Sequence, residues 1–506
     1  MRLATAVVVM IGSSYSAMLL DMVRGVLLMR LLGPTGRGIQ RGVNLLTSYL
    51  DNVHLGVRHG ISKRLPQAIA TDDSEAADAV EDISFTFILL TTTIAALAIL
   101  AWAALDRDLQ TATAVSVALG GVLLLGQQAD GLYQVVLRAF GSFRILAKAR
   151  IVFSAAQFAG MVLGAWRGGI IGAMVGWVVA YLALMVYYHF AARWRVKLRL
   201  RWDIVWRLIV IGVWIALMTL SDVLLRSVEG IIIVKYYKVY GLGLYGAATQ
   251  AAGCLYAVAQ AAQFVIWPRL LDCHARNGMG EQTRKNVVLP TVAVATLMPA
   301  VCGAAYFLLP PVISALVPRF SEAIAATQVL SMSVCLLALP IAANTLLVAT
   351  DREGLVTMFR GAGAALIAGL SLMVVRRYEH PPLELFAYCA ASGYLVAGVL
   401  ALCSVMKSLY SSARKRLAEL TVFYAPTAWA VAVVYAVGIW GAAVPGWDQR
   451  SWIAAFVKTA IYLIATIPVL IYADIRLKLR QELRRMYLEL RGNGAGIEPP
   501  ETKAGE

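Results

Sequence analysis

Apolar runs of about 20 residues recur along almost the whole chain, and this repetition limits the fold more than any other feature of the sequence. A helix of that length crosses a hydrocarbon core of about 30 Å. Backbone groups inside lipid must satisfy their own hydrogen bonds, so such runs form helices. The polar stretches between the runs are too short for a separate soluble domain. We therefore predict an all-α polytopic membrane protein.

The runs correspond to about fourteen transmembrane helices. The composition agrees with this class, because 60% of the residues are hydrophobic and 15% are charged, whereas soluble domains have about 25% charged residues. The predicted spans are 6–31, 39–62, 83–105, 112–136, 145–166, 169–191, 206–233, 244–267, 287–310, 322–349, 355–375, 384–406, 420–441 and 452–473.

Lysine and arginine are concentrated in every second loop between these spans. The basic loops include segment 138–150 and the run 193–201, and the C-terminal tail belongs to the same set. Basic loops stay on the cytoplasmic side of a membrane, so we predict that both termini are cytoplasmic. The same bias accounts for the formal net charge of +16, and no nucleic-acid partner is needed to explain it.

Charged residues inside the predicted spans are candidates for a functional site. One charge at the bilayer centre costs roughly 2.5–3.5 kcal/mol on insertion scales, so it is kept where it faces protein or water. Asp21 and Arg24 are spaced i, i+3 in the first span and can pair on one face. In the second span, a projection at about 100° per residue places Arg41, Asp51 and Arg58 on one polar face.

A third charged group lies in the seventh predicted span. Asp222, Arg226 and Glu229 follow the spacing i, i+4, i+7 and are predicted to share one face. The three groups have two interpretations. Either they are ion pairs that lock helices together, or they line a water-filled cavity between the two halves of the bundle. The number of charges favours the cavity, because so many buried pairs would be a costly way to pack helices.

Three segments resemble polysaccharide flippases. Residues 24–38 are similar to the end of the first helix of that family, which closes on an Arg-Leu-Leu-Gly-Pro-x-Gly turn. Residues 55–66 are similar to the end of the second helix. Residues 229–234 and 243–248 resemble the seventh helix and its turn into the eighth, with Glu229 at a position where the family often has Asp.

The resemblance implies the fold of the multidrug/oligosaccharidyl-lipid/polysaccharide exporter superfamily. In that fold two six-helix lobes surround a central cavity, and here two additional helices would follow them. The implied division is an N-terminal lobe, a basic cytoplasmic linker, a C-terminal lobe, two additional helices, and a tail that is first basic and amphipathic and then disordered. Their ranges are 1–192, 193–205, 206–408, 409–474 and 475–506. We find no convincing internal sequence repeat to support the two lobes.

The resemblance also implies a function as a flippase in the bacterial inner membrane. The substrate would be a polyprenyl-diphosphate-linked oligosaccharide, moved from the cytoplasmic to the outer leaflet during surface polysaccharide biosynthesis. Arginine provides a planar fork of donors for phosphate oxygens. The substrate-binding candidates are Arg24, Arg58 and Arg226. The supporting or ion-coupling candidates are Asp21, Asp51, Asp222 and Glu229. We expect no catalytic residue, cofactor or metal.

Two other functions stay open at this point. A cation-coupled multidrug antiporter of the same superfamily would need an anionic cavity, which Asp21 and Asp51 support and the arginines oppose. A membrane-embedded glycan polymerase or ligase would be an enzyme with a large outer loop, whereas the outer loops here are short. Further predicted partners are anionic lipids at the cytoplasmic face and a polysaccharide polymerase or export machinery. The chain is expected to be a monomer.

Overall fold

The structure is a computed structural model of the chain, and it describes residues 3–192, 197–444, 447–448 and 450–477. Within these ranges every regular element is a helix. The α-helices are α1 (Leu3–Leu50), α2 (Val57–Ala70), α3 (Ser74–Leu105), α4 (Thr111–Ala139), α5 (Phe143–Ala192), α6 (Trp202–Leu225), α7 (Val228–Asn277), α8 (Glu281–Leu316), α9 (Ile324–Ala338), α10 (Ile341–Ala349), α11 (Glu353–Arg377), α12 (Leu383–Leu409), α13 (Ala413–Ala443) and α14 (Trp452–Leu477). Two 3-10 helices, η1 (Asp51–His54) and η2 (Pro318–Ala323), complete the set.

Ten helical segments of the described chain are long and apolar enough to cross a membrane. They are α3 to α6, α8, the stretch 318–349, and α11 to α14. The chain is therefore a multi-pass, all-helical membrane protein, as predicted. One of the ten, α5, bends at Gly168 and Gly169 and covers two predicted spans. The finer assignment of about fourteen spans stays a prediction.

Three predicted spans are broken rather than continuous helices. The second breaks after α1, where η1 is followed by Leu55 and Gly56 with φ values of 51° and 90°. The seventh breaks between α6 and α7, at residues 226–227. The tenth breaks near Pro340, which has no amide hydrogen to continue α9 into α10. These breaks change which side chains share a helix face.

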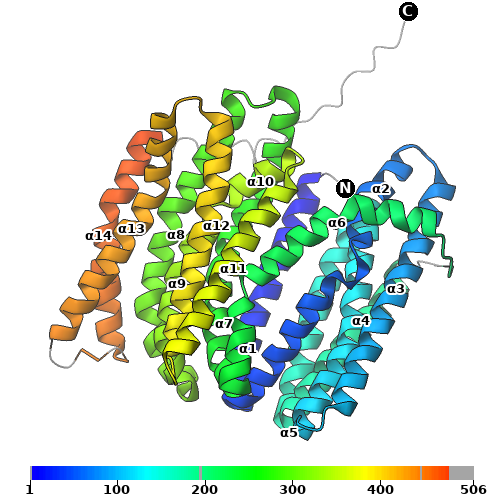
Figure 1. Cartoon of the computed structure of the whole chain (residues 1–506), viewed down its shortest axis with the longest axis horizontal. Coiled ribbons are helices and arrows are strands. Elements are labelled where there is room, and N and C mark those ends of the chain that lie inside the picture. The colour runs from blue at the N-terminus through cyan, green and yellow to red at the C-terminus, as the bar shows by residue number, and fades with distance from the viewer. Residues whose placement is uncertain (1–2, 193–196, 445–446, 449, 478–506) are drawn as a thin grey trace, which may run out of the picture.

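The long helices α1 and α7 lie side by side at the centre of the molecule (Figure 1). Helices α3, α4 and α5 pack together on one side of them, and α8, α9 and α12 to α14 form the other side (Figure 1). Helix α6 joins the two sides, because it packs against both α2 and α11. Its contact with α2 is a direct backbone approach, in which Gly212 lies against Gly56 and Gly60.

The described part of the predicted basic linker is fixed to α3. The backbone amide of Lys197 donates a hydrogen bond to Asp82 Oδ1 at 2.8 Å, and the amide of Arg199 donates to Thr86 Oγ1 at 3.0 Å. The side chains of Leu198 and Trp202 are exposed. Residues 193–196 of the linker lie outside the described residues, and so does the predicted tail from residue 478 onward.

The central helices share a bend that uncovers an internal repeat. Gly33 in α1 has φ 63° and ψ −176°, and Lys238 in α7 has φ 56° and ψ −161°. An alignment on these two residues pairs Arg24-Gly25 with Glu229-Gly230, Arg30 with Lys235, and Gly36-x-Gly38 with Gly241-x-Gly243. The side chains between the paired positions are largely apolar but rarely identical. The substitutions between apolar residues hide the repeat in the sequence, and the two bends supply its register.

The repeated glycines meet in the structure. A Cβ atom added to Gly38 would overlap the carbonyl oxygen of Val239, and one added to Gly243 would overlap the carbonyl oxygen of Pro34. Pro34 and Val239 are equivalent in the alignment, so the contact is reciprocal. We call the contact between Gly38 and Gly243 the glycine seam. It joins the backbones of α1 and α7 close to their bends.

Candidate substrate site

Asp21 and Arg24 form the predicted pair, on the part of α1 that precedes the bend at Gly33. Arg24 Nη1 lies 2.9 Å from Asp21 Oδ1. The same nitrogen donates a hydrogen bond to the side-chain oxygen of Gln157 in α5. The Arg24 side chain is 16% exposed and that of Asp21 is 46% exposed, so the carboxylate is the more accessible partner. The local spacing in the sequence was sufficient to predict this pair.

Asp51 and Arg58 also pair, but not along a helix face as the projection assumed. Arg58 Nη2 lies 2.6 Å from Asp51 Oδ2, and Nη1 lies 3.2 Å from Oδ1. A continuous helix would separate these residues by about 10 Å along its axis. The break at residues 51–56 brings them together instead. Gln128 of α4 holds the pair, because its amide nitrogen donates to the Asp51 backbone carbonyl at 2.6 Å.

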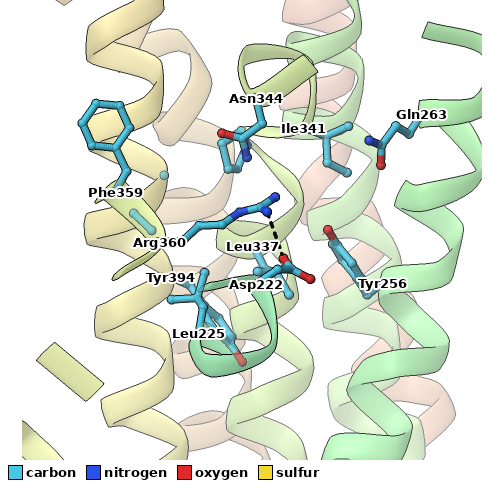
Figure 2. Close-up of a pocket in the computed structure, with 13 residues that line it drawn as sticks. Asp222, Leu225, Tyr256, Gln263, Leu337, Ile341, Asn344, Phe359, Arg360 and Tyr394 are labelled. Atoms are coloured by element: carbon cyan, nitrogen blue, oxygen red, sulfur yellow. Dashed lines mark ion pairs between the residues drawn. The ribbon is translucent and has the colours of Figure 1, made fainter. Parts of the chain in front are cut away.

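The predicted group of Asp222, Arg226 and Glu229 is divided by the break between α6 and α7. Arg226 donates to the Asp222 carboxylate, and its guanidinium carbon lies 5.6 Å from the ring centre of Tyr256. Arg360 of α11 lies on the other side of this carboxylate, with Nη1 3.6 Å from Asp222 Oδ1. Figure 2 shows Arg360 and Tyr256 approaching Asp222 from opposite helices around a small cavity. Arg360 was absent from the predicted site.

Glu229 points elsewhere, into a second small cavity between α1 and α7. Its side chain is 1% exposed. The hydroxyl of Tyr245 donates a hydrogen bond to Glu229 Oε1 over 3.3 Å. Glu229 therefore does not share a face with Asp222, because the helix on which the i, i+7 spacing was projected ends before it.

Two further arginines, Arg37 and Arg41, lie on the part of α1 that follows the bend at Gly33. Arg37 donates hydrogen bonds to the side-chain oxygens of Gln40 and Gln250, and the latter belongs to α7. Arg41 lines the cavity that contains Glu229. Helical projection placed Arg41 on the polar face of its span, but neither arginine was selected as a site residue. The signal that could have identified them is their i, i+4 spacing on one helix face, at the start of the second predicted span.

Glutamine is the recurrent partner of these arginines. Arg24 is bound by Gln157, Arg37 by Gln40 and Gln250, and Arg58 by Gln128 over 3.4 Å. A glutamine oxygen orients a guanidinium group and leaves its positive charge in place. A carboxylate would orient the group and also neutralise its charge. The region between α1, α5 and α7 therefore combines ordered arginines with a positive balance. Among the described residues, no group of three or more His, Cys, Asp or Glu side chains could hold a metal ion.

Solved structures share this fold at low sequence identity. An inward-facing multidrug resistance MATE family transporter of the MOP superfamily aligns with a TM-score of 0.67 and 14% identity, over 78% of this chain and 96% of that one. The lipid II flippase MurJ in an inward closed conformation aligns with a TM-score of 0.60 and 12% identity, over 92% of this chain and 98% of that one. A MOP superfamily transporter from Pyrococcus furiosus aligns with a TM-score of 0.58 and 14% identity, over 83% of this chain and 96% of that one. That structure is described by the reverse polarity of its binding pocket.

The sequence comparisons place the chain more narrowly than the fold does. No curated protein matches it. The model of a family of polysaccharide biosynthesis proteins matches residues 27–325, which is more than half of the chain. This range includes α2 to α8, the glycine seam and most of the charged residues described above. The chain is therefore a member of the polysaccharide biosynthesis protein family, and it shares its fold with transporters of the MOP superfamily.

Proposed function

We propose that this protein moves a polyprenyl-diphosphate-linked oligosaccharide from the cytoplasmic to the outer leaflet of a bacterial inner membrane. About fourteen spans would form two six-helix lobes and two additional helices, with both termini in the cytoplasm. No covalent bond changes in this process, so the protein would not be an enzyme. Transport would proceed by separation of the two lobes on alternate sides of the membrane.

The observation that carries this proposal is the set of arginines held by glutamines. A lipid diphosphate needs several cationic donors at once, and guanidinium groups supply them with fixed geometry. Arg24 suits this role, because it is partly accessible and already oriented by Gln157. Arg226 is oriented in a different way, by the Asp222 carboxylate and the ring of Tyr256. Arg58 would act mainly as a structural partner of Asp51, which accepts bonds from both of its terminal nitrogens.

Replacement of Arg24 by glutamine is expected to slow flipping of a lipid-linked oligosaccharide at least about tenfold. A hydrogen bond to a charged group contributes about 1.5–3 kcal/mol, and 1.4 kcal/mol corresponds to a factor of ten. The measurement is the transfer rate of the glycolipid across vesicles that contain the purified protein. The control is Arg167→Gln, because Arg167 is exposed and lies beside Trp166 away from this region. Equal rates in both variants would remove Arg24 from the site.

The same vesicles separate this function from the antiporter alternative. An organic cation would have to enter beside Arg24, Arg37 and Arg41, and like charges repel it there. We expect no proton- or sodium-driven uptake of a fluorescent organic cation. Uptake of the cation without any transfer of the glycolipid would replace the flippase proposal by the multidrug antiporter.

A further inference from the structure

The cavity between α1 and α7 contains an unpaired cation. Arg41 lies against Gly246 of α7 and lines this cavity. Within the described residues it has no hydrogen bond and no ion pair, whereas Arg24, Arg37, Arg58 and Arg226 all have partners. The Arg41 side chain is only partly buried, so its donors stay available to an occupant of the cavity.

The same cavity contains an unpaired anionic oxygen. Glu229 is 1% exposed, and only its Oε1 atom has a partner, the hydroxyl of Tyr245. Its Oε2 atom is buried without a hydrogen bond. The other polar groups that line the cavity are occupied. Arg226 donates to the Asp222 carboxylate, Ser227 is bound to Tyr49 over 2.8 Å, and Thr249 donates to the Gly246 carbonyl over 3.1 Å. The free capacity is therefore one set of donors and one acceptor.

This pairing of free groups selects the chemistry of an occupant. Arginine only donates hydrogen bonds and a carboxylate oxygen only accepts them. A bridging group must accept from Arg41 and donate to Glu229, and a hydroxyl does both. A phosphate oxygen would be repelled by Glu229, and an ammonium group would be repelled by Arg41. The free space is about 10 Å³, enough for one water molecule in this conformation.

We propose that Arg41, Glu229 and Tyr245 form a subsite for a sugar hydroxyl of the transported glycolipid. The position between α1 and α7 means that the subsite opens when these helices separate, and the sugar hydroxyl then enters between Arg41 and Glu229. The inference rests on the proposed function, because it assigns the glycan end of the same substrate. Arg24 would bind the diphosphate, and Arg41 and Glu229 would distinguish a glycosylated carrier from a bare one.

The test compares two probes, undecaprenyl diphosphate and the same lipid carrying one N-acetylhexosamine. Their affinities are measured on the full-length protein in nanodiscs. Wild type is expected to bind the glycosylated probe about tenfold more tightly, the scale of one hydrogen bond to a charged group. Arg41→Gln and Glu229→Gln should lose this preference and keep the wild-type affinity for the bare lipid. Arg24→Gln should lower the affinity for both probes by the same factor.

The control is Thr249→Val, since Thr249 lines the same cavity but its hydroxyl is bound to the Gly246 carbonyl. It should keep the full preference. Tyr245→Phe provides a milder variant if the charge substitutions reduce expression, and it should lower the preference without abolishing it. If Arg41→Gln and Glu229→Gln both discriminate as wild type does, the cavity holds a structural water only and the inference is wrong. If wild type binds neither probe, both the proposed function and this inference are wrong.

Discussion

Replacement of Gly38 or Gly243 by leucine is expected to stop transport while the protein still inserts into the membrane. At both positions a side chain would overlap a backbone carbonyl of the facing helix, of Val239 or of Pro34. A backbone carbonyl cannot rotate away as a flexible side chain can, so α1 and α7 must separate near their bends. Overpacking costs typically 1–3 kcal/mol, which is enough to shift the balance between two conformations of a transporter.

Two measurements check this prediction, the transfer of the glycolipid in vesicles and the labelling of a cysteine at Thr249→Cys by a membrane-impermeant reagent. Both leucine variants should lose transfer of the glycolipid. The cysteine at position 249 should be labelled faster by reagent added on the side of the membrane where Gly33 and Lys238 lie. The matched control is Gly253→Leu, because Gly253 lies on the same helix and has no neighbour within 4 Å of an added Cβ. Wild-type transfer in both seam variants would show that the glycine seam does not need close contact.

Replacement of Asp222 by asparagine is expected to lower the free energy of unfolding by about 3 kcal/mol. This carboxylate lies between two cations, Arg226 and Arg360, and no other acidic side chain is within 4 Å of either among the described residues. Without it, the two guanidinium groups would repel each other with no anion between them. The measurement is unfolding of the purified protein in detergent, by temperature or by denaturant.

The control for this variant is Asp203→Asn. Asp203 pairs with Arg201 at 2.9 Å, but both side chains are about half exposed or more. Surface pairs of this kind contribute about 0–1 kcal/mol, so the control should be close to wild type. The double variant Asp222→Asn with Arg360→Met should recover part of the stability, since it removes one of the two repelling charges. Equal losses for Asp203→Asn and Asp222→Asn would contradict the central role of Asp222.

The intramembrane charges were visible in the sequence, but their partners were only partly so. Asp21 and Arg24 lie three residues apart in an unbroken helix, and local geometry is sufficient for such a pair. Asp51 and Arg58 pair because the helix between them is broken, which no periodicity could indicate. Asp222 meets Arg360 from a helix far along the chain. Asp222 and Glu229 do not share the expected face, because α6 ends between them, although Arg226 and Glu229 line one cavity.

The class of this protein follows from its sequence alone. Runs of apolar residues are local, and lipid forces the backbone of each run into a helix whatever surrounds it. The charges within the runs were equally evident, because their cost in lipid makes them exceptional. The partners of those charges, in contrast, depend on the tertiary structure. It set the register of the repeat, closed the glycine seam, placed glutamines beside the arginines, and left Arg41 and Glu229 facing one cavity. All of these depend on contacts between distant segments, and helical spacing carries no information about such contacts.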